Sequence, residues 1–105
     1  MISATDALER LRDGNRRFIS DEVSEEVSAI RKHRAGAAAP QSPFAIILAC
    51  SDSRVPTELI FDQGIGDLFV IRVAGNIVAP SQIGSIEYAA KQFGTRLVVV
   101  LGHSN

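Results

Sequence analysis

Three short apolar runs in the second half of the chain, at 44–49, 68–73 and 96–101, constrain the fold most strongly. Each has the length of an ordinary β-strand, and segments with helical spacing separate them. A continuous apolar run is typical of a strand that is buried on both faces, as in a parallel sheet. The alternation of strands and helices therefore predicts an α/β fold, with a Rossmann-like parallel βαβαβ core and right-handed crossovers.

Two helices are expected between these runs. The first is short, has Pro56 in its first turn, and turns three apolar side chains inward: Leu59, Ile60 and Phe61. The second helix follows Pro80, which interrupts the preceding structure. It begins at Ser81 or Ser85 and ends at Phe93. Gly94 stands where a residue in the left-handed conformation commonly closes a helix.

The first 43 residues contain little that could enter a sheet. An amphipathic helix is predicted over 3–19, capped by Ser3 or Thr5, with its apolar face formed by Leu8, Leu11, Phe18 and Ile19. A second helix is predicted over 27–35. We therefore expect 1–43 to form an N-terminal helical arm that packs on something else, another subunit included, and 44–105 to form the α/β domain.

Size and charge exclude several classes of protein. The 105 residues suit one small domain, and the net charge of −1 argues against non-specific nucleic-acid binding, which needs several cations. The apolar runs are far shorter than the roughly 20 residues of a membrane span, so we expect no membrane association. A single cysteine cannot form an internal disulfide, which indicates a reducing, cytoplasmic location.

Reactive side chains follow two of the predicted strands. Cys50, Asp52 and Arg54 come directly after the run at 44–49, and His103 follows the run at 96–101. Ligands of open parallel sheets bind beyond the carboxyl ends of strands, so adjacent strands would bring Cys50 and His103 together. The residues alone leave three interpretations open: a buried structural cysteine with a surface ion pair, a thiol nucleophile with a histidine base, and a zinc site with two ligands.

Four segments, in this order along the chain, resemble the β-class carbonic anhydrases. They read ACSDSRVP at 49–56, DLFVIRVAGN at 67–76, SIEYA at 85–89 and GHSN at 102–105. The stretch LRDGNRRF at 11–18 is also similar to the N-terminal helix of that family. The resemblance runs through nearly the whole chain, and its most specific element is the Cys-Ser-Asp-Ser-Arg sequence.

The resemblance implies a role for each of these residues. Zn²⁺ is expected on Cys50 and His103, with Asp52 as a further ligand only in a closed form. Asp52 and Arg54 correspond to the catalytic dyad, in which the arginine holds the aspartate away from the metal. Substrate-pocket roles are implied for three further residues: Gln41, which often serves the neighbouring subunit, Phe69 and Tyr88. Ile47 stands where the allosteric branch has a tryptophan, which disfavours that branch.

The family pattern continues with a second cysteine ligand, which would be residue 106, one position after Asn105. We therefore interpret the sequence as the N-terminal half of a carbonic anhydrase, with an incomplete fold of that class. The expected function is zinc-dependent, reversible hydration of carbon dioxide to bicarbonate, impaired in this chain alone, in a homodimer or higher oligomer. Two alternatives remain: a non-catalytic fragment that pairs with a partner chain, and a related zinc hydrolase of carbon disulfide or carbonyl sulfide.

Overall fold

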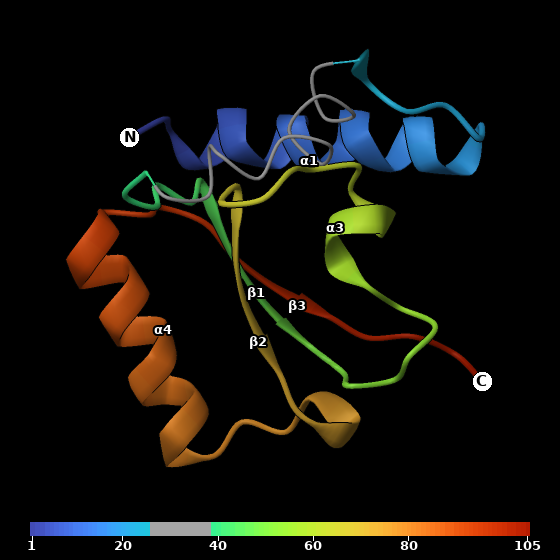
Figure 1. Cartoon of the computed structure of the whole chain (residues 1–105). Coiled ribbons are helices and arrows are strands. Elements are labelled where there is room, and N and C mark those ends of the chain that lie inside the picture. The colour runs from blue at the N-terminus through green and yellow to red at the C-terminus, as the bar shows by residue number, and fades with distance from the viewer. Residues whose placement is uncertain (26–38) are drawn as a thin grey trace.

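A computed structural model describes residues 1–25 and 39–105 (Figure 1). Three strands form its sheet: β1 (Ala45–Ala49), β2 (Leu68–Arg72) and β3 (Val98–Leu101). Their order is β2-β1-β3, and both pairings of β1 are parallel. The predicted α/β fold with a parallel sheet is therefore confirmed, and β1, buried along its whole length, is the central strand.

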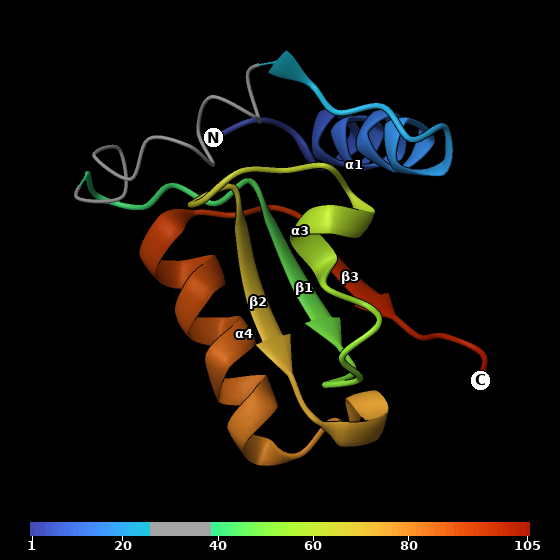
Figure 2. The ribbon, with the colours of Figure 1, turned by 45° about the vertical axis from the view of Figure 1, so that its right-hand side comes forward.

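Helices cover both faces of this sheet, because successive side chains of β1 point to opposite sides. Ala45, Ile47 and Ala49 join one apolar cluster with side chains of helix α1 (Ala4–Ile19) and with Phe61, just after helix α3 (Thr57–Ile60). Ile46 and Leu48 join a second cluster with helix α4 (Pro80–Phe93). Figure 2 shows α4 on one side of the sheet and α1 with α3 on the other.

Helix α1 forms as predicted, but it buries a different face. The Ser3 hydroxyl accepts a hydrogen bond from the backbone N–H of Asp6 at 3.1 Å, which confirms Ser3 as the cap. The buried residues are Ala7, Leu11 and Gly14, so Leu11 of the predicted apolar face is buried, whereas Phe18 and Ile19 are 47% and 74% exposed and their predicted place on the packed face is wrong.

A close contact at Gly14 explains why α1 buries this face. A Cβ atom on Gly14 would lie 1.7 Å from the carbonyl oxygen of Phe61, so only glycine lets α1 come this near to the loop after α3. Asn15, the next residue, donates a side-chain hydrogen bond to the carbonyl of Ile60 at 3.0 Å. These backbone contacts orient the helix, and Phe18 is left beside exposed Leu59 in a surface depression.

The connections differ from expectation at two points. Leu59 is 49% exposed rather than turned inward, because α3 has only four residues and presents one side to the core. Helix α4 begins at Pro80 itself rather than at Ser81 or Ser85; proline fits the first turn because its missing N–H has no helical partner there. Gly94 closes α4 with a φ of 67°, as predicted.

The predicted helix at 27–35 lies outside the described residues. Among the helices that the structure describes, none combines the length and the apolar character that crossing a membrane requires.

Candidate active site

The carboxyl ends of β1 and β3 bring the predicted reactive residues together. Ala49, the last residue of β1, pairs with Leu101, the last residue of β3. Cys50 follows the first strand directly, and His103 follows the second after one residue. The His103 side chain lies close enough to the Cys50 thiol for each group to shift the pKa of the other. Adjacent parallel strands thus join two residues that are far apart in sequence, as the sequence predicts.

Cys50 lies in an environment that favours its thiolate. Its side chain is nearly buried, and its sulfur accepts hydrogen bonds from the backbone N–H groups of Asp52 at 3.4 Å and Gly75 at 3.3 Å. The hydrogen bond with His103, followed by these two N–H groups, lowers the pKa of the Cys50 thiol to about 7, although burial opposes the shift. A thiolate near neutral pH suits a nucleophile or a metal ligand.

Asp52 and Arg54 form the ion pair that the sequence predicts. Arg54 Nε lies 3.0 Å from Asp52 Oδ1, and Arg54 Nη2 lies 2.7 Å from Oδ2. The backbone N–H of Arg54 also donates to Oδ1 at 2.8 Å. These hydrogen bonds hold the pKa of the Asp52 carboxyl far below its usual range and raise the pKa of Arg54. Asp52 is therefore a firmly ionised carboxylate with a fixed orientation.

His103 completes the cluster. Its Nε2 lies 4.0 Å from Asp52 Oδ2, and its side chain is 26% exposed. The pKa of His103 is raised, first by the hydrogen bond to Cys50 and then by the Asp52 charge, while burial opposes the increase. The site therefore holds a thiol, an imidazole and a carboxylate within mutual reach at a partly open edge of the sheet.

Two residues of this site were missed by the sequence analysis. Arg72, the last residue of β2, donates from Nε to the carbonyl oxygen of Cys50 at 2.8 Å and from Nη2 to that of Asp52 at 2.5 Å. Gly75, in the turn that follows, supplies one of the N–H groups on the Cys50 sulfur. The available signal was an arginine at the carboxyl end of a predicted neighbouring strand, where such folds place functional groups.

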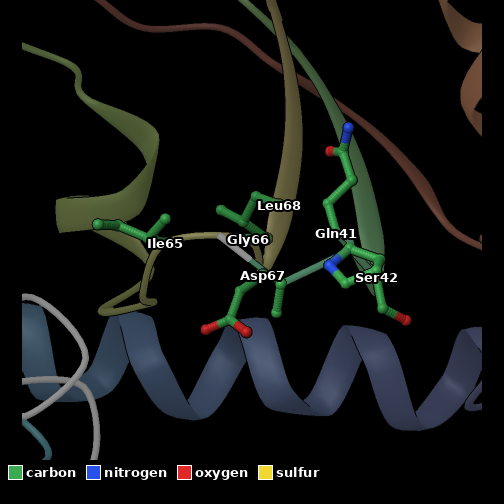
Figure 3. Close-up of a pocket in the computed structure, with 8 residues that line it drawn as sticks. Gln41, Ser42, Ile65, Gly66, Asp67 and Leu68 are labelled. Atoms are coloured by element: carbon green, nitrogen blue, oxygen red, sulfur yellow. The ribbon is translucent and has the colours of Figure 1, made fainter. Parts of the chain in front are cut away.

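Gln41 lies elsewhere in this chain. It lines an open pocket of about 540 Å³ formed by residues 39–42 and 65–68 (Figure 3). These residues precede β1 and lead into β2, so the pocket is at the amino ends of the strands. The whole length of β1 separates Gln41 from Cys50, and within one chain the structure does not bring the two together.

Phe69 and Tyr88 contact each other on the side of the sheet that α4 covers. Their ring centroids are 6.1 Å apart, and Phe93 completes a trio at 5.8 Å from Phe69 and 5.9 Å from Tyr88. Phe69 pairs in register with Ile46, near the start of β1, so this aromatic trio also lies away from the Cys50 end of the strand. Tyr88 remains 54% exposed.

The side chains at this edge of the sheet suit a metal ion in part. A cysteine sulfur and a histidine nitrogen are ligands that zinc prefers, and both are at the carboxyl edge with a carboxylate beside them. Within residues 1–25 and 39–105, however, no cluster of three or more histidine, cysteine, aspartate or glutamate side chains is placed to hold a metal. The residues present fit two positions of a zinc site.

Comparisons with known proteins point to one family. The family model described as carbonic anhydrase matches residues 45–105. "Carbonic anhydrase 2" of Mycobacterium tuberculosis is 46% identical over 99 residues, which are 94% of this chain and 47% of that protein. The chain therefore spans about half the length of the curated relatives it matches.

Solved structures agree with these sequence matches. The β-carbonic anhydrase CcaA aligns with a TM-score of 0.65 and 33% identity, over 93% of this chain and 48% of that chain. A tetrameric β-carbonic anhydrase of Sordaria macrospora aligns with a TM-score of 0.63 and 37% identity, over 67% of this chain and 37% of that chain.

Proposed function

This chain belongs to the β-carbonic anhydrase family, and on that premise we propose that it carries part of a zinc site for the reversible hydration of carbon dioxide to bicarbonate. The observation that carries the proposal is the convergence of Cys50, His103 and the Asp52–Arg54 pair at one edge of the sheet. Each of these residues matches the position and the residue type that the family resemblance requires.

Cys50 and His103 would hold the metal. Bound zinc acts as a Lewis acid and makes hydroxide available near neutral pH. Catalytic zinc sites use three protein ligands, so in this proposal a cysteine at position 106 of a longer chain supplies the third. The lowered pKa of Cys50 favours metal binding, because a thiol must lose its proton to become a ligand.

Asp52 would orient the reacting water. Arg54 keeps the pKa of the Asp52 carboxyl very low. Asp52 would therefore accept a hydrogen bond from the water without retaining a proton near neutral pH. Arg54 keeps both carboxylate oxygens engaged and would thereby hold Asp52 away from a bound metal ion. Loss of this fork would release the carboxylate to become a metal ligand, which is the proposed closed form.

The three residues expected to line the substrate pocket would do so only with a second copy of the chain. Gln41 lies at the opposite end of β1 from Cys50 and is exposed, so we assign it to the site of a neighbouring subunit. Phe69 and Tyr88 would line the substrate pocket in the same assembly. A homodimer or higher oligomer is therefore part of the proposal, together with a cytoplasmic location, which the single cysteine favours.

A non-catalytic half that pairs with a partner chain is the second candidate. Two observations favour it: the described residues hold only two of the three expected ligands, and β3 is an edge strand whose Val98 and Val100 are 44% and 61% exposed. An uncovered edge strand offers unpaired backbone groups to another chain.

The deciding experiment compares the 105-residue chain with a chain extended past position 106. Bound zinc is measured by elemental analysis, and carbon dioxide hydration by a stopped-flow proton-release assay. We expect weak zinc binding in the short chain, and stoichiometric zinc with activity after extension. A short chain with full zinc and activity would exclude the second candidate. An extended chain that binds zinc at Cys50 and His103 but does not hydrate carbon dioxide would refute the proposed reaction.

A further inference from the structure

The loop at 50–54, which carries the proposed metal ligand and the carboxylate, leaves the sheet at the end of β1. Its described backbone hydrogen bonds include the N–H of Ser51 to the carbonyl of Val73 at 3.3 Å and the N–H of Val55 to the carbonyl of Asp52 at 3.2 Å. The sheet itself thus fixes only the first part of this loop. A site that needs Cys50 and Asp52 in a fixed relation requires a further constraint.

Arg72 supplies such a constraint. It is level with Ala49 in the register of β1 and β2, one residue before the loop begins. Its Nε donates to the carbonyl oxygen of Cys50 and its Nη2 to that of Asp52, at 2.8 Å and 2.5 Å. We propose that Arg72 is a positioning residue of the site, a clamp on the loop backbone whose value rests on the function proposed above for Cys50 and Asp52.

The two contacts lie on either side of the peptide group that joins Ser51 to Asp52. The carbonyls of Cys50 and Asp52 are both held, so the intervening peptide is limited to orientations that point the N–H of Asp52 at the Cys50 sulfur, 3.4 Å away. Three residues after Arg72, the N–H of Gly75 reaches the same sulfur at 3.3 Å. Together with the Val73 carbonyl, which accepts from the N–H of Ser51, Arg72 and Gly75 hold the loop through four hydrogen bonds, and two N–H groups point at the ligand atom.

This role differs from that of Arg54. Arg54 is 67% exposed and holds the carboxylate of Asp52, whereas Arg72 holds backbone carbonyls. The planar guanidinium can donate along two directions at once, and the ammonium of lysine is a single point of charge. A lysine at position 72 would reach one carbonyl of the two and would restore the clamp only in part.

Amide hydrogen exchange by NMR on the metal-free 105-residue chain tests the clamp without needing zinc or activity. In Arg72→Gln, we expect exchange at the amides of Asp52 and Gly75 to rise by roughly tenfold or more, because loss of two charge-assisted bonds allows local opening. Arg72→Lys should give an intermediate rise. The control Arg12→Gln removes a 58% exposed arginine whose partner Glu9 is three residues away, and should change nothing.

The pattern of exchange separates positioning from general support of the fold. The Ile46 amide, bonded to the carbonyl of Leu97 at 2.9 Å in the sheet, should exchange equally in all variants. Unchanged exchange at Asp52 and Gly75 in Arg72→Gln would overturn the proposal, as would a parallel rise at Ile46, which would indicate a merely structural role.

Zinc affinity, measured by competition with a chromophoric chelator, provides the second readout. Residues that orient a metal ligand typically change affinity by about 10- to 100-fold when removed, so Arg72→Gln should weaken zinc binding within that range. Equal affinity in Arg72→Gln and the native chain would overturn the proposal. A native chain that takes up no zinc would instead count against the proposed function, and the exchange measurement would still decide the role of Arg72.

Discussion

Two aspartate–arginine pairs in this molecule have opposite surroundings. Asp62 is 3% exposed in its side chain, and its Oδ2 lies 2.5 Å from Nε of Arg17, which is 45 positions away in the sequence. Asp52 is 20% exposed, and its partner Arg54 is two residues away and 67% exposed. The first pair joins α1 to the segment after α3, whereas the second joins two neighbouring residues of one loop.

The two carboxylates are suited to different roles. The backbone N–H of Ser24 also donates to Asp62 Oδ2 at 3.0 Å, so this carboxylate is enclosed by groups that hold the fold. Asp52 is held by a partner in its own loop, and its Oδ2 lies 4.0 Å from His103. The fold does not depend on a pair that lies within one loop. The same two residue types are therefore free for chemistry at Asp52 and Arg54, whereas they stabilise the fold at Asp62 and Arg17.

The largest expected effect is that of Cys50→Ser on zinc. Removing one of the two ligands in the described chain should weaken zinc binding by roughly a hundredfold or more, because a serine hydroxyl is a far poorer zinc ligand than a thiolate. Isothermal titration with Zn²⁺ measures the change. Ser53→Ala, in the same loop, is the matched control and should bind as the native chain does. Native affinity in Cys50→Ser would show that the ligand assignment is wrong.

The next largest effect is on catalysis and compares the two aspartates directly. In whichever form of the chain hydrates carbon dioxide, Asp52→Asn should lower the rate by about 10²-fold, the cost of a reacting group that is no longer held in position. Zinc content and the thermal midpoint should stay native, because the pair lies within one loop and its arginine is exposed. Asp62→Asn should keep the native rate per folded molecule. Equal loss of activity in both variants would remove the distinction drawn above.

Stability should show the reverse order. Asp62→Asn leaves the Arg17 guanidinium without its charged partner in a largely buried place, and we expect a loss of about 2–3 kcal/mol in the free energy of unfolding. Urea denaturation measures it. Asp13→Asn is the matched control, because Asp13 pairs with Arg16 on the exposed side of α1, and exposed pairs contribute less than about 1 kcal/mol. Similar losses in both variants would contradict the structural role of Asp62.

The parts of this molecule that were predictable from sequence follow from periodicity. Continuous apolar runs predicted three parallel strands, and their ends predicted that Cys50 and His103 would meet. The prediction of the buried face of α1 was wrong at Phe18 and Ile19. In the sequence Gly14 indicates only a weak helix position, whereas in the structure its missing side chain lets the carbonyl of Phe61 pack against the helix. Tertiary contacts of this kind leave no local pattern.

The proximity of Cys50, His103 and the Asp52–Arg54 pair was predictable because their side chains are of recognisable type, whereas their roles stay predictions. The position of Arg72 at the carboxyl end of a predicted strand was a signal, but its contacts could not be predicted, because backbone carbonyls are present at every residue and mark no partner in the sequence. The roles of Gln41, Phe69 and Tyr88 stay predictions, since they depend on an assembly of chains. The division of the chain at residue 43 also stays a prediction.

The smallest expected effect concerns the protonation of Cys50. Its pKa is lowered to about 7, first by His103, so alkylation by iodoacetamide should rise with pH through that value as thiolate forms. His103→Ala removes the leading cause and should move the midpoint to higher pH. At pH 7 a rise of about one pKa unit would slow alkylation roughly fivefold. In urea both chains should titrate alike, near the ordinary thiol value. An unchanged midpoint in His103→Ala would mean that the N–H groups of Gly75 and Asp52 account for the shift, which would place control of the thiolate in the loop backbone.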